Sequence, residues 1–165
     1  MSLLDSLFGG GDSTRHPCSN CPSNCPVAGS ACSVCQPYKE KLIDAISEAI
    51  GVEALDISHP ITEPVDILFL GNSVYVTKTG RDMRHFLQKL DPKLVGEVVN
   101  ISTAGILESS YKSLCGLCAK YGITVSKKEC RCAGEFNGLH KGKPDDDDAR
   151  RAAEFAVDVV NSWEG

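Results

Sequence analysis

Apolar and polar positions follow two regular patterns between residues 39 and 163. Apolar residues spaced three and four positions apart predict four helices, near residues 39–50, 83–90, 107–118 and 145–163. Short apolar runs between them predict four strands, at residues 52–57, 65–70, 95–102 and 123–129. The run at 65–70 is almost continuously apolar, which is typical of a strand buried on both faces of a parallel sheet. Strands that alternate with helices predict βαβ units, so we expect an α/β fold.

The first 37 residues carry a different pattern, in which cysteine and proline take the place of the apolar periodicity. Five of the nine cysteines lie between Cys18 and Cys35, and four of the eight prolines lie in or beside the same stretch. The apolar pairs that precede it, Leu3-Leu4 and Leu7-Phe8, surround two polar residues. We therefore divide the chain into a Cys/Pro-rich metal-binding module, residues 1–37, and a patterned domain, residues 38–165.

The number of cysteines favours a metal site over a set of disulfides. Nine is an odd number, and 165 residues is long for a domain held together by disulfides. The first eight residues lack the basic start and the length of a secretory signal, so we expect a cytoplasmic protein. Thiols at this density in a cytoplasmic chain indicate a bound metal ion or an iron–sulfur cluster.

The spacing of the N-terminal thiols suits an iron–sulfur cluster. Five cysteines fall within 18 residues, at Cys18, Cys21, Cys25, Cys32 and Cys35. A 4Fe–4S cluster needs four thiolates, usually from a tight loop with several close spacings. Proline follows both Cys21 and Cys25, and it keeps the backbone of such a loop extended. We predict that Cys18, Cys21 and Cys25 are ligands, with Cys32 or Cys35 as the fourth.

Zinc is the alternative occupant of this module. Cys18 with Cys21, and Cys32 with Cys35, form two C-x2-C pairs that could build a tetrahedral site of four thiolates. That arrangement would leave Cys25 without a role. A third reading, in which these thiols bind no metal, also stays open.

Four segments of the patterned domain carry a family resemblance. They are Leu70-Gly71-Asn72-Ser73-Val74-Tyr75, the stretch 80–87, Ser102-Thr103-Ala104-Gly105, and the stretch 132–145. With these segments, the chain from Lys39 to Trp163 resembles the flavodoxin family. The resemblance implies a flavodoxin-like, doubly wound parallel sheet of four or five strands, with ligands outside the carboxyl ends of the strands. It also implies that a cofactor would contact loop residues Gly71, Asn72, Ser73, Tyr75, Thr103, Ala104 and Gly105.

The chain departs from the family at its N-terminus. Flavodoxins begin with a strand and a loop that wraps the FMN phosphate, whereas here the Cys-rich module precedes the first patterned helix. We therefore expect weak or absent FMN binding, although Tyr75 could still stack on a flavin ring. We also expect either a four-stranded sheet, in which the strands at 52–57 and 65–70 are neighbours, or an N-terminal segment that fills the gap irregularly.

The other four cysteines have apolar surroundings in the sequence. Cys115 and Cys118 share a helical face with leucines, so we expect them to be buried as small apolar side chains. Cys130 and Cys132 lie at the end of the last predicted strand and would point to the same face. They could chelate a metal jointly, approach a bound cofactor, or simply pack as the resemblance implies.

Charge and hydropathy exclude two classes of function. The net charge is −5 and the Lys and Arg residues form no cluster along the chain, so we expect no nucleic-acid partner. No apolar run approaches 18 residues, so we expect no membrane span. The remaining prediction is an electron-transfer protein that carries an iron–sulfur cluster and meets a redox partner protein. The alternative is a zinc-stabilised, cofactor-free interaction module.

Overall fold

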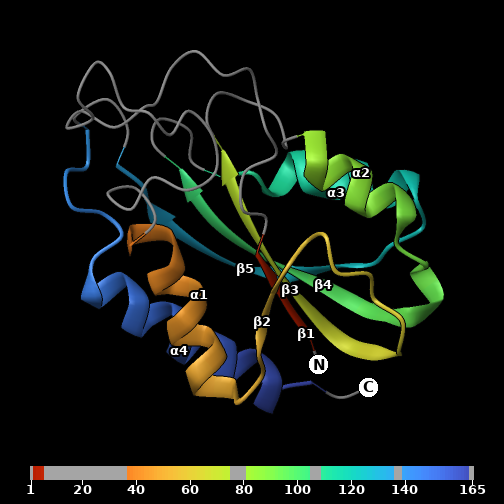
Figure 1. Cartoon of the computed structure of the whole chain (residues 1–165), viewed down its shortest axis with the longest axis horizontal. Coiled ribbons are helices and arrows are strands. Elements are labelled where there is room, and N and C mark those ends of the chain that lie inside the picture. The colour runs from red at the N-terminus through yellow and green to blue at the C-terminus, as the bar shows by residue number, and fades with distance from the viewer. Residues whose placement is uncertain (1, 6–36, 75–80, 105–108, 136–138, 164–165) are drawn as a thin grey trace.

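Five parallel strands form one sheet, with helices on both of its faces (Figure 1). The computed structural model describes residues 2–5, 37–74, 81–104, 109–135 and 139–163. The strands are β1 (Ser2–Asp5), β2 (Ala54–Asp56), β3 (Val65–Val74), β4 (Val95–Ala104) and β5 (Val125–Ala133). The helices are α1 (Pro37–Ile50), α2 (Arg81–Lys89), α3 (Tyr111–Lys120) and α4 (Asp146–Asn161), with a 3-10 turn, η1 (Pro92–Leu94), before β4.

The order of the strands is β2-β1-β3-β4-β5, and every neighbouring pair is parallel. This confirms the predicted α/β class and the parallel sheet. All five carboxyl ends therefore meet at one edge of the sheet, which is where ligands of open parallel α/β folds bind.

The prediction of a four-stranded sheet is wrong. Residues 2–5 form a regular strand that pairs on both sides, with Leu3 opposite Ala54 of β2 and opposite Phe69 of β3. The strands at 52–57 and 65–70 are consequently not neighbours, and the first strand is not replaced by the Cys-rich module. A four-residue strand carries too few apolar positions to show in a sequence pattern. Here it is stabilised by backbone hydrogen bonds to strands on both of its sides.

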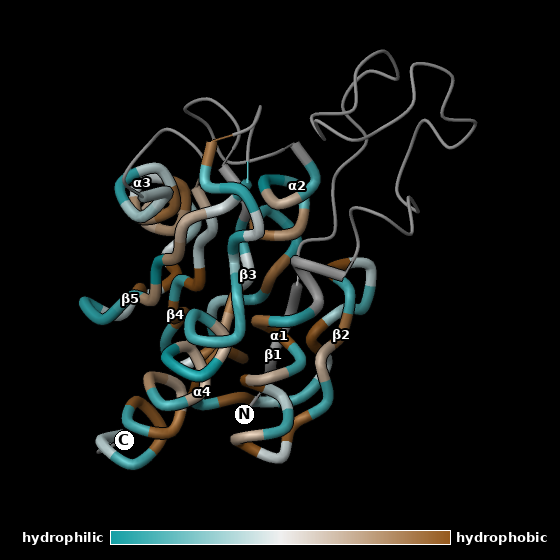
Figure 2. The backbone as a smooth tube through the Cα atoms, turned by 90° about the vertical axis from the view of Figure 1, so that its left-hand side faces the viewer, coloured by the Kyte–Doolittle hydropathy of each residue, from teal (hydrophilic) through white to brown (hydrophobic). Residues whose placement is uncertain are grey.

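Each face of the sheet buries a separate apolar cluster. On one face Ile67 and Phe69 of β3 pack with α1 and α4, and on the other face Leu68 and Leu70 pack with α2 and α3. Side chains of a strand alternate between the two faces, so two covered faces require a continuous apolar run. The two helix pairs are seen on opposite sides of the sheet in Figure 1, and Figure 2 shows the alternating hydropathy of the helices.

Element ends agree with local signals, apart from several shifts. Gly51, with φ +66°, ends α1, and Asp145 caps α4. The strands β3 and β4 continue past their predicted ends to Val74 and Ala104, and β5 runs to Ala133. In contrast, α3 begins at Tyr111 rather than near residue 107.

Candidate functional site

The carboxyl ends of β3 and β4 bring most of the predicted cofactor residues together. Gly71, Asn72 and Ser73 lie opposite Ile101, Ser102 and Thr103, and Val74 lies opposite Ala104. Gly71, Asn72, Ser73, Thr103 and Ala104 belong to the strands themselves, whereas the sequence placed them in loops. The reason is that the ladder between β3 and β4 continues to their ends. Tyr75 and Gly105 lie outside the described residues. The cofactor set itself stays a prediction.

Asn72 and Ser102 carry buried polar atoms that the rest of the described structure does not satisfy. The two residues are 5% and 1% exposed, and neither Asn72 Nδ2 nor Ser102 Oγ has a hydrogen-bond partner among the described residues. By strand alternation both side chains lie on the α2/α3 side of the sheet, like Leu70 and Val98. A buried polar atom without a partner costs about 1–3 kcal/mol, so this pair is unusual in a stable fold.

A satisfied polar network adjoins this pair on the same side of the sheet. Asn100 Nδ2 donates to Glu129 Oε2 at 3.1 Å, and Ser109 Oγ donates to the same oxygen at 2.6 Å. Ser110 Oγ donates to Asn100 Oδ1 at 3.3 Å. These bonds tie the start of α3 to β4 and β5. Among the described residues, the buried polar side chains of this network therefore have hydrogen-bond partners. Asn72 Nδ2 and Ser102 Oγ, near the carboxyl ends of β3 and β4, do not.

Sequence reasoning named Asn72 but missed Ser102 and this network. The alternation of Val98, Asn100 and Ser102 along β4 places two polar side chains on a buried face. These polar residues within an otherwise apolar strand were the sequence signal that could have identified Ser102 and Asn100.

The connection between β1 and α1 carries all five N-terminal cysteines. The strand β1 ends at Asp5, which lies opposite Gly71 of β3, and α1 begins at Pro37. The chain therefore leaves the sheet at the same edge as Asn72 and Ser102. Cys18, Cys21, Cys25, Cys32 and Cys35 themselves lie outside the described residues, so their ligand roles stay predictions.

Four cysteines fall within the described ranges, and all four are free thiols. Cys118 is fully buried among the apolar side chains between α3 and the sheet, and burial raises its pKa to about 12. Cys115 is half-buried on the same helix. The prediction that this pair packs as small apolar side chains is thus confirmed for Cys118 and holds in part for Cys115.

Cys130 and Cys132 lie on one face of β5, as their spacing predicted. They are 8% and 7% exposed and belong to the apolar cluster beneath α1 and α4. The neighbouring Cys130 thiol holds the pKa of Cys132 below its usual value. The neighbouring Cys132 thiol, together with burial, raises the pKa of Cys130.

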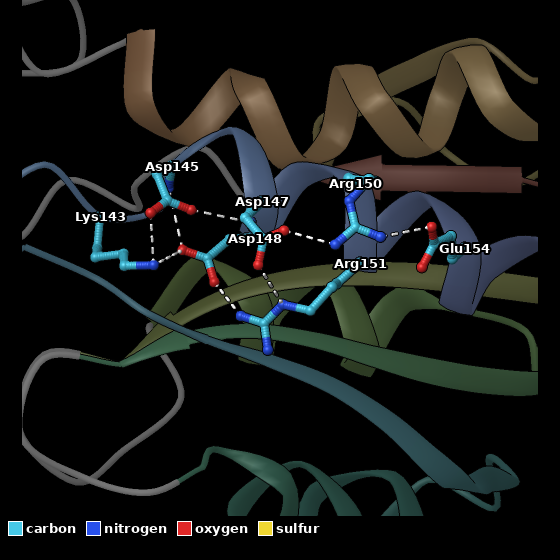
Figure 3. Close-up of polar contacts among 7 residues, drawn as sticks. All are labelled: Lys143, Asp145, Asp147, Asp148, Arg150, Arg151 and Glu154. Carbon is cyan, nitrogen blue, oxygen red and sulfur yellow. Dashed lines mark hydrogen bonds and ion pairs between the residues drawn. The ribbon is translucent and has the colours of Figure 1, made fainter.

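A charged network surrounds the start of α4 (Figure 3). The backbone N–H of Asp148 donates to Asp145 Oδ1 at 3.0 Å, and the backbone N–H of Asp145 donates to Asp148 Oδ2 at 3.1 Å. Lys143 Nζ contacts both carboxylates, at 2.7 and 2.9 Å, and Arg151 bonds the second one. The side chain of Asp148 is only 2% exposed. The run of carboxylates at 145–148 therefore forms the start of α4, and two cations balance its buried charge.

Comparisons with known proteins identify the architecture. No family model matches the chain. It is 28% identical over 137 residues to an uncharacterized protein of Methanocaldococcus jannaschii, a match covering 74% of this chain and 90% of that protein. It is similar in structure to a flavodoxin from the domain Archaea, with a TM-score of 0.62, 13% identity, and coverage of 98% of this chain and 97% of that one. It is also similar in structure to the oxidised flavodoxin 1 of Bacillus cereus, with a TM-score of 0.58 and 18% identity. That match covers 78% of this chain and 93% of the Bacillus cereus chain.

The fold is flavodoxin-like. The carboxyl edge of this flavodoxin-like sheet is therefore the candidate site, and it contains the unpartnered atoms of Asn72 and Ser102. Within the described ranges, no three or more His, Cys, Asp or Glu side chains are grouped to hold a metal ion. No helix in the same ranges is long and apolar enough to span a membrane.

Proposed function

We propose that this protein transfers electrons through an iron–sulfur cluster that its N-terminal cysteines hold on the flavodoxin-like domain. The observation that carries the proposal is topological. The five cysteines, with close C-x2-C and C-x3-C spacings, occupy the connection from β1 to α1. In a flavodoxin-like fold this connection adjoins the ligand edge, because it follows the carboxyl end of β1.

The ligand set follows from the spacing of the thiols. Cys18, Cys21 and Cys25 would supply three thiolates, and Cys32 or Cys35 the fourth. A bound 4Fe–4S cluster would supply one-electron redox chemistry, and the chain would set its potential through burial and hydrogen bonds to sulfur.

Chain length supports a cluster near the carboxyl edge. Cys35 is two residues before the first residue of α1. An extended residue spans at most about 3.5 Å, so the last cysteines cannot be far from the start of this helix. The ends of β3 and β4, including Gly71 and Thr103, would then shield the cluster from solvent and face the redox partner protein.

The residues present also fit the ring of a flavin at this edge. Asn72 Nδ2 is a donor and Ser102 Oγ can donate or accept, and both lack partners among the described residues. A planar ligand with polar atoms along one edge would satisfy both atoms. The cysteines occupy the connection that wraps the FMN phosphate in flavodoxins, so we expect the phosphate to be held poorly and FMN to bind weakly.

Metal content and absorption of the anaerobically purified protein test the proposal. We expect about four iron and four sulfide per chain, and a broad absorption band near roughly 400 nm that bleaches on reduction. Colourless protein with one bound zinc would contradict the proposal and support the zinc-stabilised interaction module instead. Protein that binds neither iron nor zinc after anaerobic reconstitution would exclude a metal role for the module.

A further inference from the structure

Cys130 and Cys132 form a buried pair of thiols that the proposed function does not use. They occupy alternate positions of β5, opposite Ile101 and Thr103 of β4, so both side chains point toward α1 and α4. Both residues are more than nine-tenths buried, at 8% and 7% exposed, and both belong to the apolar cluster beneath α1 and α4. Two thiols therefore share one face of β5, two residues apart, in a water-poor environment.

The charges that act on this pair come from the start of α4 and the segment before it. Arg151 and Lys143 are the cations that act on Cys132, and Asp148 is the anion. Asp148 already accepts from both cations, and its buried carboxylate is one of two that Lys143 contacts. A site of net charge −1 at the two sulfurs would thus lie near two cations and the carboxylate that they share.

We propose that Cys130 and Cys132 form a two-thiolate site for a soft monovalent metal ion of the Cu(I) class. Thiolate sulfur selects soft metal ions, whereas zinc sites require four ligands. Within the described ranges no third His, Cys, Asp or Glu completes a larger ligand group at this position. The pair therefore suits a metal ion that binds with only two sulfur ligands.

Binding is a ligand exchange without a change of oxidation state. Each thiol loses one proton, so two protons are released and two sulfur–metal bonds form. One monovalent cation with two thiolates carries a net charge of −1, which Arg151 and Lys143 favour and Asp148 disfavours. The proposal does not rest on the iron–sulfur assignment, because none of its residues lies in the N-terminal module.

An anaerobic Cu(I) titration of the full chain, against a chromogenic Cu(I) chelator as competitor, tests the site. The five N-terminal thiols would compete for Cu(I) as soft ligands, so all five are first replaced by Ser. In that background we expect one tight equivalent of Cu(I). Adding Cys130→Ser and Cys132→Ser should remove this equivalent. The control adds Cys115→Ser and Cys118→Ser, which removes one half-buried and one buried thiol from α3 and should leave the equivalent in place.

Three outcomes would overturn the proposal. They are no tight equivalent in the five-Ser background, an equivalent that survives loss of Cys130 and Cys132, and an equivalent lost equally in the control. If circular dichroism shows that the five-Ser chain does not fold, the same two pairs of substitutions are compared in the otherwise native chain. In that chain, the site is supported if only the Cys130/Cys132 double variant loses one equivalent of Cu(I). It is refuted if this variant and the Cys115/Cys118 double variant bind the same number of equivalents.

Discussion

Asn72 of β3 and Ser102 of β4 lie opposite each other in the parallel ladder, and each buries a polar atom with no partner in the described structure. A few residues away, Ser110 and Asn100 are equally buried and bonded to each other. The same layer of the protein thus contains satisfied and unsatisfied polar groups. The unsatisfied ones lie at the carboxyl edge of the sheet, where ligands of open parallel α/β folds bind.

Two serine-to-alanine variants, Ser102→Ala and Ser110→Ala, compare the unsatisfied and the satisfied hydroxyl. Ser102→Ala removes a hydroxyl that has no hydrogen-bond partner among the described residues, so the free energy of unfolding should stay unchanged or rise by up to about 1 kcal/mol. Ser110→Ala removes a hydrogen-bond donor to buried Asn100, so it should lower the free energy of unfolding by about 1 kcal/mol. Urea unfolding of both variants measures the difference. Equal destabilisation would show that the Ser102 hydroxyl has a partner in the folded protein.

The N-terminal thiols should be needed for metal, and the helix thiols should not. Replacing Cys18, Cys21 or Cys25 by Ser is expected to remove most of the iron and sulfide, because a cluster needs all four thiolates. Cys115→Ser leaves the candidate ligands intact and should keep full metal content. Elemental analysis of anaerobically purified variants measures this. Full metal content in all three N-terminal variants would refute the ligand assignment.

FMN should bind weakly to the isolated protein. The segment that would grip the phosphate carries cysteines, so only the ends of β3 and β4 remain to hold the ring. Titration followed by flavin fluorescence should show little quenching at equimolar protein. Tight stoichiometric binding would make the protein a two-cofactor iron–sulfur flavoprotein and contradict our expectation.

The buried carboxylate at the start of α4 should be important for stability. Asp148→Ala leaves the Lys143 and Arg151 cations without their shared partner and removes half of the capping box. We expect a loss of about 3 kcal/mol, as for other buried charge pairs broken on one side. Asp146→Ala, on an exposed residue of the same turn, is the control and should cost less than about 0.5 kcal/mol. Denaturant unfolding compares them, and similar losses would contradict this role.

Asp145 should make stability depend on pH in the acid range. A hydrogen bond from Lys143 holds the pKa of this carboxyl below its ordinary value of about 3.9. The folded state then favours the ionised form, so its contribution is present above about pH 4 and declines as pH falls below that value. In Asp145→Asn the helix cap is kept but this group no longer titrates. The melting temperature of the variant should therefore change less between pH 5 and pH 2.5, and parallel curves would exclude this linkage.

The regular part of the fold could be predicted from the sequence because its signals are local. The apolar spacing of α1, α2 and α4 and the continuous run in β3 each describe an element that buries one or both of its own faces. The glycine that ends α1 and the aspartate that caps α4 act on their immediate neighbours. None of these signals needs information from distant segments. The thiol spacing of the N-terminal module is also local, and it was sufficient to predict a ligand set.

Only the tertiary structure decided the position of β1 and the composition of the ligand edge. Residues 2–5 form a strand because β2 and β3, from distant parts of the sequence, offer backbone hydrogen bonds on both of its sides. The pairing of Asn72 with Ser102 depends on the register between β3 and β4, which no pattern within either strand contains. The charges that act on Cys132 arise because the start of α4 lies against β5. The sequence alone determined which elements form, whereas contacts between distant segments determined which residues share a site.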